Sequence, residues 1–357
     1  TSTPKPAGNS RPSAASWPGG TRELLTVARR LLKVTKRLTE EKEVADEDYV
    51  TAAINDAIGF LSQSVIAIWY RGKPRRAQGI PPSIQKVFSE ICDLSKRRFI
   101  FGRVILAGEL NSLFIVDPIW TRRYLLPSFN WEVSEKEATA VWQGYLRNPR
   151  TNDDLLWELK ESFLQTAEHV LALKDYNSQY ASLLAWIAIE KQATHFTLIE
   201  LRNALNHLPV LDLAHAAQTA DHVLVSSGEQ REACWENRLQ PFFAKVWPKS
   251  GDRKSERASQ FLAEICTHAG AQFPEAVAEL VPRMCRSKEM YVVCKSLVQN
   301  NCGKKFPLST LTLLDSFIDT NYPWPPRELR EVLEQIAAND RKAVQRASFK
   351  RLSDYLL

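Results

Sequence analysis

Apolar side chains recur along most of this chain at the spacing of one face of an α-helix. After an N-cap at Thr21, this spacing predicts a first helix that ends at about Glu43. A second helix starts at Asp46 or Asp48 and ends near Tyr70. Further helices are predicted over about 83–94, 98–116, 153–174, 179–190, 326–338 and 341–356. The pattern therefore indicates an all-α fold.

Polar residues at the expected helix starts support this prediction. Ser134 and Glu137 form the sequence of a capping box, in which each side chain bonds the other residue's backbone N–H. Thr197 and Glu200 repeat the arrangement, and Asp117 followed by a proline is typical of an N-cap and first helical position.

Aromatic residues concentrate in two of the predicted helical regions. The segment Leu125–Arg150 holds Trp131 and Trp142, and we expect both rings to be buried where an irregular N-terminal region meets the helices that follow. In residues 229–250 an aromatic face surrounds Pro241, which predicts a kink in that helix and packing of its rings into the core.

A Phe-Pro pair recurs in the last third of the chain. Gly270 precedes Phe273 and Pro274, and after 33 residues Gly303 precedes Phe306 and another proline. In each copy we expect the glycine to end one helix and the proline to start the next. A period of this length is typical of repeated helix pairs.

These patterns divide the chain into three parts. Residues 1–20, rich in Pro, Ser and Gly, are predicted to form a flexible linker. Residues 21–130 are predicted to form an N-terminal helical region, and residues 131–357 a region of stacked helix pairs in a HEAT-like α-solenoid. Because the chain starts at Thr1 with a linker, we also expect it to be a piece of a longer protein.

Composition supports helix and excludes little else. Among 357 residues there are only 13 glycines, and the net charge of +6 is mild. The six cysteines have no signal peptide before them, which indicates reduced thiols in a cytoplasmic protein. Arg103 interrupts the longest apolar run, so no membrane span is predicted.

Two basic segments stand out as possible interaction surfaces. One is the Gly- and Pro-containing loop over 71–82, and the other is a face of the first helix. Either could contact phosphate groups, although a solvated helix face and the absence of aromatic residues beside the loop argue against it. The residues concerned are Arg71, Lys73, Arg75, Arg76, Arg29, Arg30, Lys33 and Arg37.

Enzymatic chemistry is not indicated. Cys266, His268 and the later cysteines contain no CxxC pair, so buried structural thiols are favoured over a metal site. Asp154, Glu158 and Lys160 superficially resemble a nuclease motif but belong to one predicted helix. Neither a nucleophile elbow nor a glycine-rich phosphate loop occurs. We therefore expect no enzyme and no cofactor in this chain.

Several segments carry a resemblance to a known family. They are LLPSFNW (125–131), AVWQGYLRNPR (140–150), QYASLLAWIAI (179–189), GEQREACWENRLQPFFAKVWPKS (228–250), the FPEAV and FPLSTLTLLD stretches, and PPRELREVLEQIA (325–337). From about 125 to 357 the chain resembles the helical C-terminal domain of bacterial sirtuin-type antiphage defence proteins.

The resemblance implies a function as part of a larger protein. Its upstream sirtuin-like domain would hydrolyse NAD, and this chain would act as a helical sensor or scaffold module through protein–protein interaction. No sirtuin nucleotide-binding motif is present, so no NAD-site residue carries over. The alternative is a basic helical nucleic-acid-binding protein.

Overall fold

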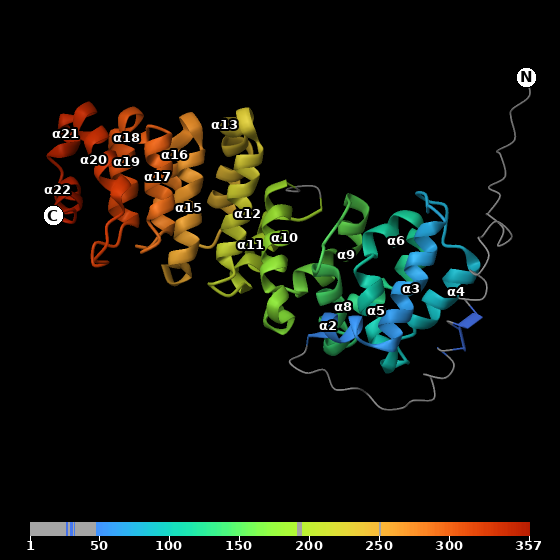
Figure 1. Cartoon of the computed structure of the whole chain (residues 1–357). Helices are drawn as coiled ribbons and strands as arrows, with labels where there is room; N and C mark the ends of the chain where they lie inside the picture. The colour runs from blue at the N-terminus through green and yellow to red at the C-terminus, as the bar shows by residue number, and fades with distance from the viewer. Residues whose placement is uncertain (1–25, 28, 31, 33–47, 191–194, 250) are drawn as a thin grey trace, which may run out of the picture. The chain divides into compact units, whose positions relative to one another are not determined.

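The computed structural model describes residues 26–27, 29–30, 32, 48–190, 195–249 and 251–357. These residues form an all-α protein (Figure 1), as the apolar spacing predicts. Within them no strand is present, and Ser287 and Ile318 make one isolated parallel bridge. The chain divides into two compact units, Thr1–Tyr176 and Asn177–Leu357, called unit 1 and unit 2 below.

The helices of unit 1 are short. Its elements are α2 (Tyr49–Ile54), α3 (Ala57–Arg71), α4 (Pro82–Ile91), η3 (Arg97–Phe99), α5 (Ile100–Ala107), α6 (Leu110–Val116), α7 (Pro118–Tyr124), η4 (Leu126–Phe129), α8 (Glu135–Leu146), α9 (Asp153–Gln165) and η5 (Val170–Tyr176). Helix α5 contacts α2, α3 and α8, which makes it the centre of this unit. Gly144 permits the close approach of α8, because a Cβ there would overlap the carbonyl oxygen of Val104.

Four predicted helices are interrupted. The helix over 48–70 breaks where the Asp56 carboxylate accepts the N–H of Ile58 and so starts a new helix, α3. The helix over 98–116 bends by 79° between α5 and α6. The helix over 153–174 ends at Gln165, and the last one, over 341–356, divides into α21 (Arg341–Val344) and α22 (Ala347–Asp354). At Asp56 an internal cap overrides a continuous apolar pattern.

The first predicted helix lies mostly outside the described residues. Thr26, Val27, Arg29, Arg30 and Leu32 are helical, and Leu32 is buried. The linker predicted over 1–20 also lies outside the described residues.

The two predicted capping boxes differ in the structure. At α11 (Leu198–His207) both halves form, with Glu200 N donating to Thr197 Oγ1 and Thr197 N donating to Glu200 Oε2. At α8 Ser134 accepts the N–H of Glu137, but the Glu137 carboxylate bonds Arg103 instead of the cap. A buried arginine is a stronger partner for a carboxylate than one backbone amide, so the second half of the predicted box at Ser134 is wrong.

Trp131 and Trp142 are buried, as predicted. The Trp142 ring meets Phe129 edge to face and donates its Nε1–H to the Phe129 carbonyl oxygen at 3.2 Å. Trp131 stacks on His169 and donates to Thr166 Oγ1 at 2.8 Å. The rings are therefore part of the core of unit 1.

Unit 2 is a succession of helices that lie side by side (Figure 1). Its elements are α10 (Asn177–Glu190), α11 (Leu198–His207), α12 (Leu213–Ser226), η6 (Gly228–Gln230), α13 (Arg231–Cys234), the π-helix η7 (Trp235–Leu239), α14 (Gln240–Lys245), η8 (Gly251–Arg253), α15 (Glu256–His268), η9 (Gly270–Gln272), α16 (Phe273–Leu280), η10 (Val281–Arg283), α17 (Tyr291–Gln299), α18 (Cys302–Lys305), α19 (Pro307–Phe317), α20 (Arg327–Asn339), α21 (Arg341–Val344) and α22 (Ala347–Asp354).

The contacts in unit 2 follow two rows. In one row α10 contacts α12, α12 contacts α15, α15 contacts α17 and α17 contacts α20. In the other row α14 contacts α16, α16 contacts α19 and α19 contacts α22. Each helix therefore packs mainly on its neighbours along its own row and on the adjacent helices of the chain.

Pro241 lies where the helix register changes. The turn before it, η7, is a π-helix, and α14 begins one residue ahead of the proline. Since proline has no N–H to donate, a local change of register accommodates it without ending the helix. The surrounding aromatic rings are all buried, as predicted: Trp235, Phe242, Phe243 and Trp247.

The two Phe-Pro copies meet in space. The rings of Phe273 and Phe306 stack with centroids 5.6 Å apart, and both prolines lie in the first turn of a helix. Gly270 has a φ of +63° after α15, as a helix-ending glycine should. Gly303 does not end a helix, because it lies inside α18. Asn301 adopts the left-handed conformation there instead, so that part of the predicted repeat is wrong.

The compact units and the predicted domains divide the chain differently. The sequence places a boundary at 130/131, whereas the compact units divide after Tyr176. Helix α8 belongs to unit 1, where it contacts α5 and α2. Compactness and repetition are different properties, so the repeat region over 131–357 stays a prediction.

Candidate interaction surface

The basic loop, residues 71–79, has a defined backbone in unit 1. Its far end is held by the N–H groups of Ala77 and Gly79, which donate to the carbonyls of Ile115 and Val116 at 2.9 Å each. Asp117 then accepts the N–H of Ile80 at 3.1 Å while it also caps α7. The loop is therefore attached to the junction of α6 and α7.

Two residues in the basic loop adopt a conformation that L-amino acids avoid. Lys73 has a φ of 48° and Ala77 has a φ of 56°. Such values cost free energy when the residue is not glycine. The side chains of Lys73, Arg75, Arg76 and Ala77 are all exposed. The strained backbone is therefore not compensated by burial of these side chains. A strained, exposed and attached loop is typical of a functional segment.

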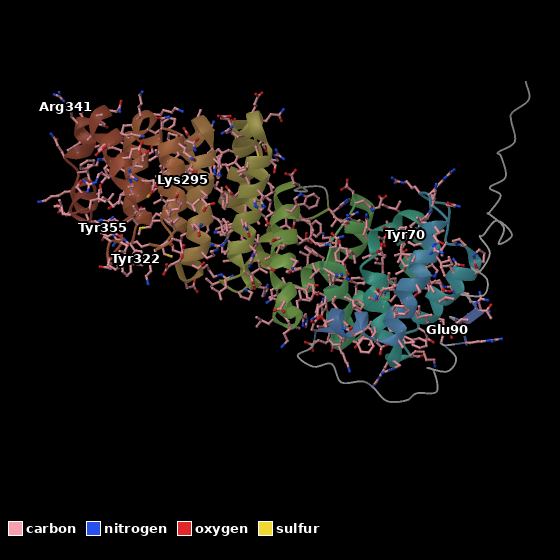
Figure 2. The ribbon with its side chains drawn as sticks, viewed as in Figure 1. Tyr70, Glu90, Lys295, Tyr322, Arg341 and Tyr355 are labelled. Atoms are coloured by element: carbon pink, nitrogen blue, oxygen red, sulfur yellow. The ribbon has the colours of Figure 1, made fainter. Side chains whose placement is uncertain are left out.

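The loop cations have few partners within the protein. Arg76 reaches Asp154 at 4.0 Å, a distance at which two exposed side chains contribute little. Arg71, Lys73 and Arg75 are exposed as well, as expected for a surface that contacts another molecule. Figure 2 shows the end of α3 at the labelled Tyr70, which immediately precedes Arg71.

Aromatic side chains do lie near the loop, contrary to the sequence-based expectation. Tyr70 is 41% exposed and donates its hydroxyl to Glu109. Burial and then that hydrogen bond raise the pKa of Tyr70 to about 12, so the phenol stays a donor. Trp157 is 59% exposed on α9, one turn beyond the Asp154 carboxylate that faces Arg76.

Helix α9 connects the loop to α7. Glu158, one turn after Asp154, accepts a hydrogen bond of 2.9 Å from Arg122 Nε on α7. Asp154, Trp157 and Glu158 share a helix face by their spacing. The indole of Trp157 therefore lies on the face to which Arg76 and Arg122 both attach.

The other predicted basic segment is only partly described. Arg30 is exposed, whereas Arg29 donates to the Ser83 carbonyl oxygen at 3.0 Å and is half-buried. Lys33 and Arg37 lie outside the described residues. The structure therefore gives Arg29 a contact within unit 1 and leaves the joint surface of this segment a prediction.

A buried ion pair in unit 1 has no signal in the sequence. Arg103 is fully buried and its guanidinium bonds both carboxylate oxygens of Glu137, with Nη2 to Oε2 at 2.9 Å. It also donates to the carbonyl oxygens of Ile91, Asp93 and Lys96. Five acceptors therefore surround one guanidinium, which is a structural arrangement.

A pocket of about 450 Å³ opens beside this ion pair. Its apolar part includes Tyr49, Ile100 and Phe101, and Glu137 also lines it. Arg98, at the rim, is paired with Asp56 at 3.4 Å. Glu137 already bonds Arg103 and Arg98 already bonds Asp56, so neither of these two lining groups is poised as a catalytic group.

Unit 2 holds a second polar cluster between α12 and α15. His268 Nδ1 lies 2.7 Å from Asp221 Oδ1, and Gln260 donates to Glu264 at 2.8 Å. Burial lowers the pKa of His268, but the hydrogen bond and charge of Asp221, with Glu264, raise it overall. Burial raises the pKa of Glu264. These hydrogen bonds join α12 to α15 through Asp221 and His268, and residues of α15 to each other through Gln260 and Glu264.

The cysteines are free thiols in the structure, and all but Cys285 are buried. Burial raises the pKa of Cys92 and of Cys294 to about 12 and that of Cys302 to about 11. Groups of three or more potential metal ligands do not occur in the described part of the chain. Apart from Cys285, the cysteines are therefore buried thiols, as the sequence indicates.

The nuclease-like residues lie on one helix, as predicted. Asp154 and Glu158 on α9 face Arg76 and Arg122, respectively, and not a common centre. No single helix among the described residues is long and apolar enough to cross a membrane, although α5 and α6 with η3 pass that test together despite their 79° bend.

Comparisons with known proteins identify one relative. Over 125 residues the chain is 26% identical to "Uncharacterized protein y4cA" of Sinorhizobium fredii (strain NBRC 101917 / NGR234). The alignment covers 34% of this chain and 10% of that protein, so the chain spans a small part of its length. No model of a known protein family matches, and no solved structure matches. About a third of this chain is therefore similar to a segment of a much longer bacterial protein.

Proposed function

We propose that this chain is a helical sensor or scaffold module of a cytoplasmic bacterial antiphage defence protein. It acts through protein–protein interaction and regulates an upstream sirtuin-like domain that hydrolyses NAD. The partner is that effector domain, a second copy of the chain, or a phage protein. The chain itself carries no enzymatic activity and no cofactor.

The helix contacts of unit 2 support the scaffold part of this proposal. Two rows of helices in which each packs on the next suit a HEAT-like α-solenoid. Proteins of that kind bind partners along the loops and faces that the stacking leaves open.

The observation that carries the proposal is an aromatic edge of unit 2, formed by Tyr322 and Trp324. Trp324 is 70% exposed and contacts the ring of Tyr322. Exposed tryptophan and tyrosine are the residues most often found at the centre of protein interfaces.

The aromatic edge is fixed in place before any partner binds. Tyr355 donates its hydroxyl to the Tyr322 carbonyl oxygen at 2.6 Å, and Figure 2 labels both residues at this edge. Ser287 N donates to the Phe317 carbonyl oxygen at 2.8 Å, which joins the loop before α17 to the loop before α20. Prolines on both sides of Trp324 restrict its backbone. A rigid aromatic anchor loses little entropy on binding.

The upstream reading frame and NAD turnover test this proposal together. We expect a sirtuin-like region before Thr1, NAD hydrolysis by the longer protein, and none by the purified chain 1–357. Trp324→Ala in the longer protein should weaken the regulation of NAD hydrolysis, whereas Ile199→Ala, at a comparably exposed apolar residue on α11, should not. NAD turnover by the chain alone would contradict the proposal.

The alternative function, nucleic-acid binding, has one specific observation in its favour. The basic loop of unit 1 is strained, exposed and flanked by aromatic rings. This surface does not depend on the scaffold proposal.

A further inference from the structure

The basic loop and its neighbours form one surface in unit 1. The loop surface comprises the cations Arg71, Lys73, Arg75, Arg76 and Arg122, the aromatic residues Tyr70 and Trp157, and the carboxylates Asp154, Glu158 and Glu109, the last bonded by Tyr70. From these elements we propose that the loop surface binds single-stranded nucleic acid, with the cations on phosphates and Trp157 as a stacking platform for a base. This inference deepens the alternative function, nucleic-acid binding, and rests on unit 1 alone, independently of the scaffold proposal.

The loop surface has an excess of positive charge. Its five cations outnumber its three carboxylates by two. Asp154 engages Arg76 at 4.0 Å with both groups exposed, so a phosphate can replace it at little cost. Glu158 holds Arg122 at 2.9 Å and keeps that guanidinium beside α9. Exposed cations in a row are what a phosphate backbone requires.

Two exposed aromatic residues accompany these cations. Trp157 lies on α9 between the attachment points of Arg76 and Arg122 and is mostly exposed. Tyr70 precedes the first loop cation and is partly exposed. Cations that hold the backbone together with an aromatic face that stacks a base are the two parts of a single-strand site. An acidic protein surface would use the cations but gain nothing specific from an exposed indole.

The backbone of the basic loop is held in a defined conformation. The loop backbone is held by Ile115, Val116 and Asp117 with Lys73 and Ala77 in the left-handed region. The side chains of the loop are presented outward and contribute no core packing. The fold therefore maintains a strained backbone that is bonded to the end of α6 and presents the loop side chains outward.

Fluorescence anisotropy with a labelled 20-nucleotide mixed-sequence strand, as DNA and as RNA, tests the proposal on the whole chain. With about four phosphate contacts, Kd should weaken about 50-fold between 50 and 200 mM salt. A 20-base-pair duplex should bind more weakly than the single strand at equal salt, because its bases are not available to stack. A poly-glutamate peptide should compete poorly.

Matched variants separate this surface from general charge. Arg75→Glu with Arg76→Glu should weaken binding more than tenfold and reduce the salt dependence. Lys249→Glu with Lys288→Glu makes the same charge change at exposed residues of unit 2 and should leave Kd within twofold. Trp157→Ala should weaken binding roughly tenfold with an unchanged salt dependence, and Trp157→Phe should recover most of the loss.

Four results would overturn the proposal. They are no binding at 50 mM salt, equal weakening by the two charge reversals, equal competition by poly-glutamate, and an unaltered Kd in Trp157→Ala. Thermal unfolding by circular dichroism checks that each variant folds. The replaced side chains are exposed, so we expect all variants to retain the parent's unfolding temperature.

Discussion

The two units use arginine for the same task in opposite surroundings. In unit 1, Arg103 is fully buried and donates to the carbonyl oxygens at the end of α4 and beyond it. In unit 2, Arg253 is half-buried and donates to the carbonyls of Leu205 and Leu208 at the end of α11. Both satisfy carbonyl groups that a helix end leaves without a partner.

The difference lies in the counter-ion. Arg103 has lost all contact with water and bonds the Glu137 carboxylate, whereas Arg253 retains water contact and bonds carbonyls in the described structure. Arg202 behaves like Arg253, donating to the Lys245 carbonyl oxygen at the end of α14. A buried charge requires an opposite charge, and a partly hydrated one does not. Arg103 thus carries a buried ion pair, whereas Arg253 and Arg202 bond carbonyls with part of the guanidinium in water.

The strongest test of this comparison is Arg103→Met. It leaves the Glu137 carboxylate buried without its partner, which should cost about 3–5 kcal/mol of unfolding free energy in urea. The double variant with Glu137→Leu should recover most of that loss, because an apolar pair needs no compensation. A loss below ~1 kcal/mol in the single variant would mean that water reaches this site.

Trp142→Ala tests whether the aromatic core of unit 1 contributes as much unfolding free energy as the buried ion pair. Removing this fully buried ring and its hydrogen bond to Phe129 should cost about 3–5 kcal/mol, measured by chemical denaturation. Trp142→Phe serves as the control and should retain part of the packing. Equal stability of the parent and Trp142→Ala would contradict the packing seen here.

Gly270 and Gly228 offer a matched pair in unit 2. Both have positive φ, but a Cβ at Gly270 would overlap the Glu232 carboxylate, while a Cβ at Gly228 would meet nothing. Gly228→Ala should cost about 1–2 kcal/mol for its backbone alone. Gly270→Ala should cost about 1 kcal/mol more, because Glu232 loses its hydrogen bond from Ala271 N–H. Equal thermal destabilisation would show that Glu232 moves aside freely.

Arg253→Met should be milder than Arg103→Met. It leaves the Leu205 and Leu208 carbonyls without a partner but no buried charge, so we expect about 1–2 kcal/mol. Hydrogen exchange should quicken near the end of α11 and stay unchanged in unit 1. A loss as large as that of Arg103→Met would remove the distinction between the units.

The smallest effect concerns pH in unit 2. The raised pKa of His268 means that folding favours its protonated form through Asp221. This stabilisation is fully present below the ordinary pKa of 6.5 and is lost as pH rises through the raised value. The urea midpoint should therefore fall slightly between pH 6 and 8, and His268→Gln should flatten that decline. An identical pH dependence in both proteins would exclude His268 as its source.

Much of the local structure could be read from the sequence, because it depends on neighbouring residues. The caps at Asp117 and Thr197 and the helices that follow form as their side chains predict. The apolar face of Asn177–Glu190 and the aromatic residues around Pro241 are buried as expected. These features follow from helical spacing and backbone chemistry alone.

The candidate surface could be predicted only in part. Its loop cations are visible as a basic run, but their aromatic neighbour Trp157 is 81 residues after Arg76. Trp157 lies on the same face of α9 as Asp154 and Glu158. Asp154 contacts Arg76 of the loop, and Glu158 accepts a hydrogen bond from Arg122 of α7. Contacts between residues so distant in sequence leave no local pattern to read.

The sequence by itself determined that this protein is all helical, where several of its helices begin, and that Trp131, Trp142 and the aromatic residues around Pro241 are buried. The tertiary structure decided where continuous apolar patterns break, as at Asp56 and between α5 and α6. It also decided that Glu137 leaves its capping box for Arg103, and that Asn301 replaces Gly303 at a turn. The physical reason is that spacing and caps act within a few residues, whereas desolvation of a charge and close helix packing depend on the whole fold.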